Sequence, residues 1–139
     1  MAYDSQNIFA KILRAEAPSF KIYEDDKTYA MMDIMPQTKG HLLILTKEEA
    51  ETLLDLSVEG AQACVATAKK IAPALLEVTK ADGFILSQFN NEIAGQTVYH
   101  VHFHLVPRYI GQKVERHGRV KGDMDEIAEL ARQIAAAIK

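Results

Sequence analysis

The sequence predicts an α+β fold built around a mainly antiparallel β-sheet. Two short segments with strand-forming residues, 21–24 and 28–32, are separated by a turn at Asp25-Asp26, which predicts a β-hairpin. Strand and helix patterns do not alternate strictly along the chain, as they would in a doubly wound parallel sheet. Because 139 residues suffice for one sizeable core, we expect a single domain over residues 1–139.

The first elements follow from apolar spacing and from the positions of proline and glycine. Helical spacing predicts a short helix that begins near Ile8 and stops before Pro18. After the hairpin, proline and glycine mark a loop over residues 35–40. A compact apolar strand is then expected over residues 41–45, with a histidine as its first residue.

Two helices are expected next. Thr46 and Glu49 form a capping-box pattern, which predicts a short helix through about Leu56. Ser57 is expected to cap the longest helix of the chain, which Pro73 should kink or end. The apolar stripe that this helix should bury comprises Val58, Ala61, Val65, Ala68, Ala72 and Leu75.

The last third of the chain is expected to hold two strands and a final helix. A strand over 83–89 and a polar loop over 90–97 precede a strand that carries three histidines. The segment 109–121 is expected to be irregular. Asp123 and Glu126 predict the start of a helix over 123–138. Its apolar face comprises Ile127, Leu130, Ala131, Ile134 and Ile138.

Composition is ordinary for a soluble globular protein, with 48% hydrophobic and 25% charged residues. A formal net charge of −3 gives no reason to expect nucleic acid or an anionic membrane as a partner. The single cysteine, Cys64, cannot form an internal disulfide, which fits a reducing compartment. The first residues lack the pattern of a signal peptide, and no apolar stretch approaches the ~20 residues of a membrane span. We therefore expect a cytoplasmic protein.

The segment 100–105 is where we expect the chemistry. His100, His102 and His104 alternate there with apolar residues, so a strand would place the three imidazoles on one face and the apolar side chains on the other. One interpretation is a half-buried strand whose polar face happens to be histidine. Another is phosphoryl or nucleotidyl transfer, in which one imidazole attacks phosphorus while its neighbours hold the oxygens.

A metal site is the third interpretation. His100 and His104 are separated by roughly 13 Å of strand, whereas zinc–nitrogen bonds are only ~2.0–2.1 Å long. The three histidines of this segment are therefore not expected to share one ion. Two of them together with His41 could do so, and that alternative stays open.

The run His-Val-His-Phe-His-Leu-Val at 100–106 resembles the signature of the histidine-triad family. The segment Gly-Gln-Thr-Val at 95–98 and the segment Asp-Ile-Met-Pro-Gln-Thr-Lys-Gly-His at 33–41 also resemble that family at matching spacing. The resemblance covers the chain from about 8 to 108 and implies a five-stranded, mainly antiparallel sheet with helices packed on one side. Residues 123–138 would then be a C-terminal extension. In that family two subunits join into a homodimer with a continuous ten-stranded sheet.

The resemblance also implies roles for four histidines. His102 matches the nucleophile, which becomes transiently nucleotidylated. His104 matches the residue that contacts the phosphate and the bridging atom. His100 matches the residue that orients the nucleophile through its backbone carbonyl, and His41 matches a fourth histidine buried behind the triad.

Further positions match the family's substrate contacts. Asn90, Gln96 and Thr97 match phosphate-binding positions, and Asp33 matches the carboxylate that accepts hydrogen bonds from both ribose hydroxyls. An apolar slot that holds a purine face by packing is implied by Ile8, Phe9, Ile12, Met31 and Ile34. Each of these residues would be an ordinary core or loop residue on composition alone.

Some family members carry two cysteines near the N-terminus, three residues apart, in a structural zinc site. Asn7 and Ala10 stand at the corresponding positions here, so we do not expect that metal site. We expect no cofactor either.

The resemblance implies a purine nucleotide hydrolase or transferase that acts on AMP or GMP derivatives, most simply by cleaving nucleoside 5′-phosphoramidates to the monophosphate. The alternatives are a dinucleoside polyphosphate hydrolase and a nucleotide-binding scaffold protein with little turnover.

Overall fold

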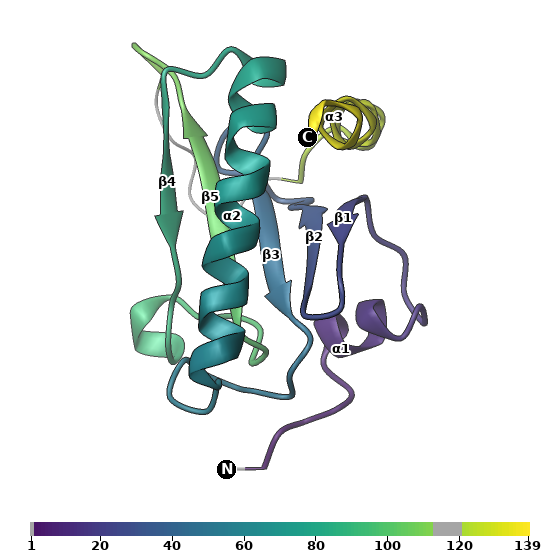
Figure 1. Ribbon diagram of the computed structural model, residues 1–139, viewed down its shortest axis with the longest axis vertical. Helices are drawn as coiled ribbons and strands as arrows, with labels where there is room; N and C mark the ends of the chain where they lie inside the picture. Colours follow the sequence, from purple (N-terminus) through teal and green to yellow (C-terminus); the bar gives the residue numbers. More distant parts are fainter. Residues whose placement is uncertain (1, 113–120) are drawn as a thin grey trace.

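The computed structural model of the chain describes residues 2–112 and 121–139 and contains the predicted antiparallel sheet (Figure 1). The sheet has five strands in the order β1-β2-β3-β5-β4, and all neighbouring pairs are antiparallel. The strands are β1 (Lys21–Glu24), β2 (Thr28–Met32), β3 (Leu42–Thr46), β4 (Gly83–Ser87) and β5 (His102–Arg108). The helices are α1 (Ile8–Leu13), α2 (Val58–Thr79), α3 (Met124–Ala137) and the short 3-10 helix η1 (Glu92–Ala94). This arrangement confirms the predicted fold class.

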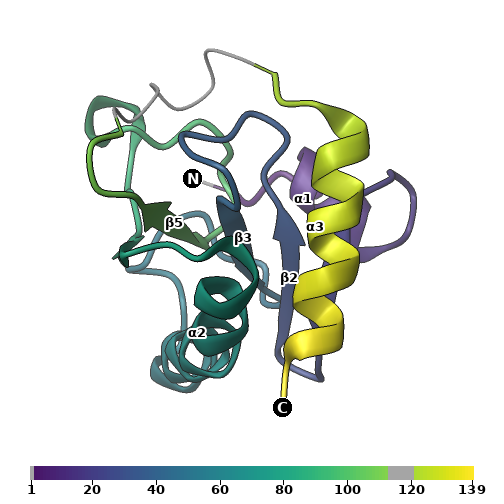
Figure 2. The same cartoon turned by 90° about the horizontal axis from the view of Figure 1, so that it is seen from above.

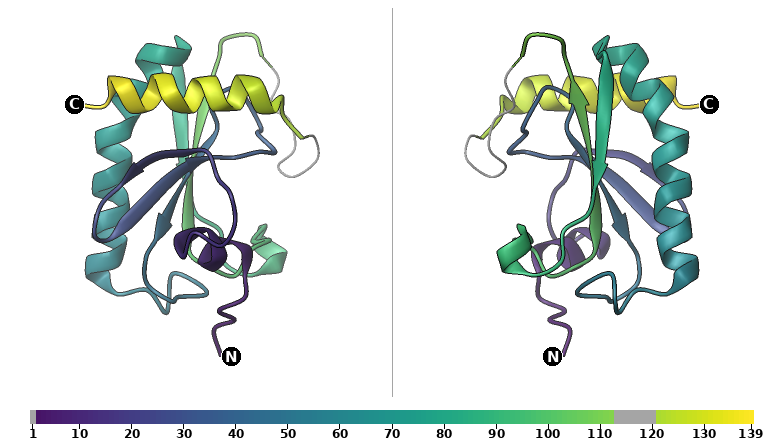
Figure 3. Two further views of the ribbon diagram at one scale, coloured as in Figure 1. Left: turned by 90° about the vertical axis from the view of Figure 1, so that its right-hand side faces the viewer. Right: turned by 90° about the vertical axis from the view of Figure 1, so that its left-hand side faces the viewer.

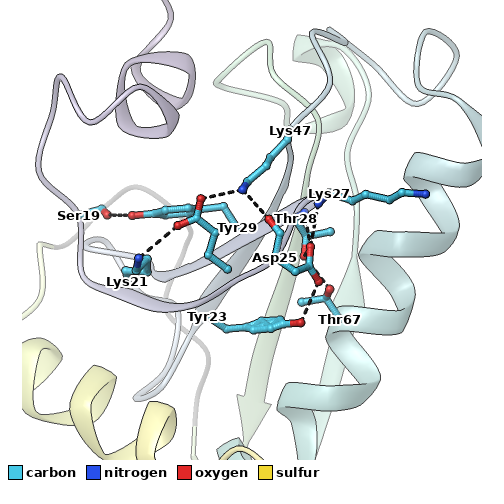
Figure 4. A network of polar contacts seen from close by, with 10 residues as sticks. Ser19, Lys21, Tyr23, Asp25, Lys27, Thr28, Tyr29, Lys47 and Thr67 are labelled. Carbon is cyan, nitrogen blue, oxygen red and sulfur yellow. Dashed lines mark hydrogen bonds and ion pairs between the residues drawn. The ribbon is translucent and has the colours of Figure 1, made fainter.

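The predicted hairpin is held by the carboxylate of Asp25 (Figure 4). Oδ1 of Asp25 accepts hydrogen bonds from the backbone N–H groups of Lys27 and Thr28, and Oδ2 accepts one from the hydroxyl of Tyr23. The hydroxyls of Thr28 and Thr67 lie 2.7 Å apart in the interior, which ties the hairpin to α2. The polar turn residues that predicted the hairpin therefore also anchor it.

The two long helices cover one face of the sheet. Viewed along the plane of the sheet, α2 lies over β3 and β5, while α3 crosses β1 and β2 and contacts α2 (Figures 2 and 3). Alternate strand residues pack against these helices in one large core, among them Ala30, Ile44 and Leu105. The prediction of helices on one side therefore holds for α2 and α3.

The short helix α1 lies on the opposite face of the sheet (Figure 3). Phe9 and Ile12 of α1 pack there with Met31, Leu43 and Leu45 in a second, smaller core. Because successive strand residues point to opposite faces, the partners of these residues on β5 also face α1. This smaller side of the sheet carries the histidines.

Each of the three α-helices in the described residues is preceded by a capping residue whose side chain accepts a hydrogen bond from the first turn. Asn7 accepts from the N–H of Ala10, Ser57 from Gly60, and Asp123 from two N–H groups of its first turn. Ser57 and Asp123 were the predicted caps. A side-chain acceptor at this position satisfies a backbone donor that the helix itself leaves unpaired.

The predicted helix between Thr46 and Leu56 is wrong. The structure has turns and bends there, and Oγ1 of Thr46 accepts a hydrogen bond from the N–H of Glu48, two residues on, which closes a turn. Glu48 instead accepts hydrogen bonds from the N–H and hydroxyl of Ser57, the cap of α2. The carboxylate near Thr46 thus stabilises the next helix rather than one that starts at Thr46.

Two details of α2 also differ from expectation. The helix continues past the exposed Pro73 to Thr79. The stripe that it buries is rotated from the predicted one, because Val58 and Val65 are exposed whereas Gly60, Cys64 and Thr67 face the core. The expected strand over 83–89 ends at Ser87, and residues 113–120 of the segment expected to be irregular lie outside the described residues.

The edge strand β4 presents apolar side chains to solvent. Phe84, Ile85 and Leu86 are 44%, 45% and 38% exposed, and the strand pairs only with β5. Unpaired edges of this kind are templates for pairing with another strand.

Within the described residues, no helix has both the length and the apolar character needed to cross a membrane.

Candidate active site

The sheet register places two of the three histidines side by side on the face that α1 covers. His102 and His104 lie on β5 opposite Leu45 and Leu43 of β3, and their ring centroids are 5.0 Å apart. Phe103, between them, points into the larger core. The predicted alternation of imidazole and apolar faces is therefore present on β5.

His100 lies two residues before β5, outside the strand that was expected to carry it, and both of its ring nitrogens have hydrogen-bond partners. Nε2 lies 2.7 Å from the backbone oxygen of Thr46, and Nδ1 lies 2.5 Å from the hydroxyl of Tyr3. A carbonyl oxygen can only accept, so Nε2 of His100 carries a proton. Burial lowers the pKa of the His100 imidazole, and the bond to Thr46 opposes that shift. Neutral His100 then has an unprotonated Nδ1 that accepts from Tyr3.

His102 donates a hydrogen bond from Nδ1, which determines its neutral tautomer. Its Nδ1 lies 2.6 Å from the backbone oxygen of His100, which again can only accept. The neutral ring therefore carries its proton on Nδ1, and Nε2 has a lone pair. Phe9 of α1 packs its ring edge to face with His102, at a centroid distance of 4.8 Å. Such packing restricts the orientation of the imidazole.

His41, at the start of β3, has the opposite arrangement because its partner is a donor. The backbone N–H of Gln37 donates to Nδ1 of His41 over 3.0 Å, so the neutral ring carries its proton on Nε2. That nitrogen lies 3.0 Å from Nδ1 of His104 and 3.5 Å from Oδ2 of Asp33. His41 therefore donates to Nδ1 of His104.

The hydrogen bond from His41 determines which ring nitrogen of His104 carries the proton. Because Nδ1 of His104 accepts, a neutral ring carries its proton on Nε2 and is a donor there. The ring of Phe89 lies 5.1 Å from that of His104 on its other side. The neutral rings of these adjacent imidazoles on β5 thus differ in tautomer: Nε2 of His102 is unprotonated, whereas Nε2 of His104 carries a proton.

A largely apolar cavity of about 480 Å³ opens beside His102. Its walls contain every residue that the resemblance assigned to the base pocket, together with Asp33 and Thr97, which were assigned to the ribose and the phosphate. From α1, β2 and the loop after β2 these residues are Ile8, Phe9, Ile12, Met31 and Ile34. Residues far apart in the sequence therefore surround one cavity, and the imidazole of His102 forms part of its wall.

The three expected phosphate ligands differ in their surroundings. Thr97 is exposed and lines the cavity. The amide of Asn90 bonds with the side chain of Gln88 and the N–H of Leu53. Gln96 is buried, and its amide bonds only with backbone groups, donating to two carbonyls and accepting from one N–H. The side chain of Gln96 therefore shapes the loop, and Thr97 is the residue directed at the cavity.

The HIT domain family model matches residues 14–111, which contain this site from Asp33 to the end of β5. The chain belongs to the histidine-triad (HIT) family. It is 35% identical over 142 residues to the adenosine 5′-monophosphoramidase of Saccharomyces cerevisiae, with 98% of this chain and 85% of the yeast protein covered.

Solved HIT structures share the fold over nearly the whole chain. A HIT-like protein from Bartonella henselae is 42% identical, with a TM-score of 0.91 over 99% of this chain and 100% of that one. A zinc-bound histidine triad protein from Mycobacterium smegmatis is 34% identical, with a TM-score of 0.85 over 95% of this chain and 92% of that one.

Among the described residues, 2–112 and 121–139, one group of side chains could hold a metal ion, and it lies in the HIT site. It comprises Asp33, His41 and His104, whose ligand atoms lie within 4.8 Å of one another. This differs from the set left open from the sequence, because only one triad histidine takes part. The hydrogen bond between His41 and His104 already accounts for their 3.0 Å spacing. At the positions of the family's cysteine pair, Asn7 caps α1 and Ala10 has no ligand atom, so a thiolate zinc site does not fit.

Several residues of the HIT site were not identified from the sequence. Tyr3 bonds to His100, the N–H of Gln37 orients His41, and the ring of Phe89 packs on His104. The cavity wall also includes Ala17, Pro18, Ser19, Met32, Met35, Leu43 and Val98. These contacts join distant segments, and no local pattern of residues indicates them.

The lowered pKa of His100 predicts that the folded protein becomes less stable as the pH is lowered. Above pH ~6.5 the imidazole is neutral in both the folded and unfolded chain. Below it, the unfolded chain binds a proton that folded His100 resists, so the free energy of unfolding decreases. Urea titrations between pH ~7.5 and ~5, above the range of ordinary carboxyl groups, should show a shallower decrease for His100→Gln than for the unaltered protein. Equal slopes would contradict this assignment.

Proposed function

We propose that this HIT-family nucleotide hydrolase cleaves nucleoside 5′-phosphoramidates through a covalent nucleotidyl intermediate on His102. One observation carries the proposal. Nε2 of His102, a residue that lines the apolar cavity, has a lone pair, while Nε2 of the adjacent His104 has a proton. Nucleophilic displacement at phosphorus needs both groups next to each other. The identity to a yeast adenosine 5′-monophosphoramidase supports the same reaction class.

The cavity suits a purine nucleoside. Its apolar walls offer packing to the faces of a flat base, and Asp33, whose Oδ2 lies 3.5 Å from Nε2 of His41, also lines the cavity. A carboxylate has two oxygens that can accept hydrogen bonds from both ribose hydroxyls. The nucleotide would thus lie with its base toward α1 and its α-phosphate at His102.

The reaction balances over two displacements. In the first, the lone pair of His102 Nε2 bonds to phosphorus and the phosphorus–nitrogen bond of the substrate breaks. The departing amine takes up one proton, for which Nε2–H of His104 is the donor that we propose. In the second, water attacks the adduct, the histidine–phosphorus bond breaks, and the proton released by water replaces the one given to the amine.

Replacing the nucleophile should abolish turnover but not binding. We expect His102→Ala to lose at least roughly a thousandfold in kcat for an adenosine phosphoramidate and to bind AMP within about tenfold of the unaltered protein. Acid-free quenching with radiolabelled substrate and peptide mapping should place the label on the peptide that contains His102. Label on another peptide, or an active His102→Ala, would contradict the covalent mechanism.

A second substrate separates the alternatives. Faster turnover of a dinucleoside tetraphosphate than of the phosphoramidate would favour the polyphosphate hydrolase, and tight binding of AMP with turnover of neither substrate would favour the scaffold protein.

Asp33 should discriminate ribose from its deoxy analogues. Charge-assisted hydrogen bonds contribute ~1.5–3 kcal/mol against ~1 for neutral pairs. We therefore expect Asp33→Asn to weaken AMP binding more than binding of a 2′,3′-dideoxy analogue in calorimetric titrations. Because Asp33 also accepts the N–H of Met35 and lies near His41, an equal loss for both ligands would show that its role is to hold the loop.

We expect turnover without a divalent metal, because each step above uses only imidazole nitrogens and water. Dialysis against EDTA should leave kcat unchanged. Loss of activity that Zn²⁺ restores would instead favour a metalloenzyme, with Asp33, His41 and His104 as the ligands to test.

We also propose a homodimer formed through β4. Its exposed apolar residues and free edge support pairing with β4 of a second copy, which would extend the sheet. Sedimentation equilibrium at micromolar concentration should give twice the chain mass, and Ile85→Lys should shift it toward the monomer. A single 15.5 kDa species for the unaltered protein would rule out the dimer.

A further inference from the structure

Tyr3 links the segment before α1 to the histidines of the active site. Its hydroxyl lies 2.5 Å from Nδ1 of His100 and 2.9 Å from Nδ2 of Asn7. The rings of Tyr3 and His100 meet edge to face with centroids 5.7 Å apart. Asn7 also caps α1 through its side-chain oxygen, so its amide bonds at both ends.

These hydrogen bonds form a series, and the acceptor at one end of it determines which group donates in each bond. The carbonyl of Thr46 makes Nε2 of His100 the protonated nitrogen, so Nδ1 accepts and the Tyr3 hydroxyl donates. The hydroxyl oxygen in turn accepts from the amide N–H of Asn7. Asn7, Tyr3, His100 and Thr46 therefore form one chain in which every donor has an acceptor.

We propose that Tyr3 is a positioning residue for the nucleophile. The ring of His100 is almost fully buried and bonded at both nitrogens, which fixes the residue whose backbone oxygen accepts the proton of His102 Nδ1. Holding that oxygen in place keeps His102 in the tautomer with the proton on Nδ1 and a lone pair on Nε2. The inference rests on the proposed function for its kinetic meaning, although the chain of bonds can be tested without turnover.

Loss of the Tyr3 hydroxyl has a defined consequence. A buried Nδ1 without a donor is a costly unpaired acceptor, so His100 would rotate or bind a proton instead. Rotation would move His100, and protonation would give its ring a positive charge. Either change affects the residue whose backbone oxygen orients His102. Displacements of a catalytic group by ~1 Å can cost up to ~10²-fold in rate, so an intermediate loss is expected here.

Two substitutions separate positioning from a structural role. Tyr3→Phe keeps the ring and removes the hydroxyl. Tyr23→Phe is the matched control, because its hydroxyl bonds Asp25 in the hairpin. For the phosphoramidate substrate we expect Tyr3→Phe to lower kcat about tenfold and to change KM no more than about threefold, with Tyr23→Phe close to the unaltered protein.

Asn7→Asp is the sharper test. Asp is as good an N-cap as Asn, so α1 should keep its first-turn bond. The new carboxylate cannot donate to Tyr3 and would instead accept from its hydroxyl, which withdraws the donor from His100. Asn7→Asp also removes the hydrogen bond from Nδ2 of Asn7 to the backbone oxygen of Asp4, so its thermal stability is measured alongside its activity. If that stability is unchanged, a structural role for this segment predicts full activity, whereas the positioning role predicts a loss of kcat similar to that of Tyr3→Phe.

Long-range ¹H–¹⁵N spectra of histidine-labelled protein provide a readout that does not depend on activity. We expect Tyr3→Phe and Asn7→Asp to shift Nδ1 of His100 and to mix the tautomers of His102, while Tyr23→Phe leaves both unchanged. Unchanged His102 signals in both variants, or full activity in both, would overturn the inference. If the unaltered protein turns over no phosphoramidate but these shifts occur, the proposed function fails while the positioning role of Tyr3 stands.

Discussion

Three backbone groups that cannot titrate determine which nitrogen carries the proton in four histidines. The oxygen of Thr46 makes His100 a donor from Nε2, and the oxygen of His100 makes His102 a donor from Nδ1. The N–H of Gln37 makes His41 a donor from Nε2 and, through it, does the same for His104. An imidazole alone has two nearly equivalent neutral tautomers, so without these partners neither nitrogen of His102 would be fixed as the unprotonated one.

The fold serves to place those backbone groups. Register between β3 and β5 brings the end of β3 beside His100, since Leu45 pairs with His102. The loop after β2 is closed by a hydrogen bond from the N–H of Asp33 to the oxygen of His41. Thr38 in that loop donates to the oxygen of Pro107 on β5. Packing of α2 and α3 on the far face supports the sheet, which leaves the near face available for α1 and the cavity.

Much of this arrangement could be predicted because it depends on residues that are close together in the sequence. The hairpin, the caps at Ser57 and Asp123 and the alternating histidines follow from short-range rules, and the family resemblance named eight of the fifteen residues that line the cavity. The predicted helix after Thr46 failed because Glu48, rather than Glu49, is the carboxylate that matters, and it bonds to Ser57. The buried stripe of α2 was misplaced because small residues such as Gly60 face the core while Val58 does not. Tyr3 and the N–H of Gln37 could not be found from the sequence, because each acts on a histidine through a tertiary contact.

The proton arrangement itself can be measured. Long-range ¹H–¹⁵N correlation spectra of the unaltered protein at neutral pH distinguish the two neutral tautomers of each imidazole and the doubly protonated form. The structure predicts Nδ1–H for His102 and Nε2–H for His41, His100 and His104. A His102 that carries its proton on Nε2, or on both nitrogens, would contradict the account, because Nε2 could not then attack phosphorus as we propose.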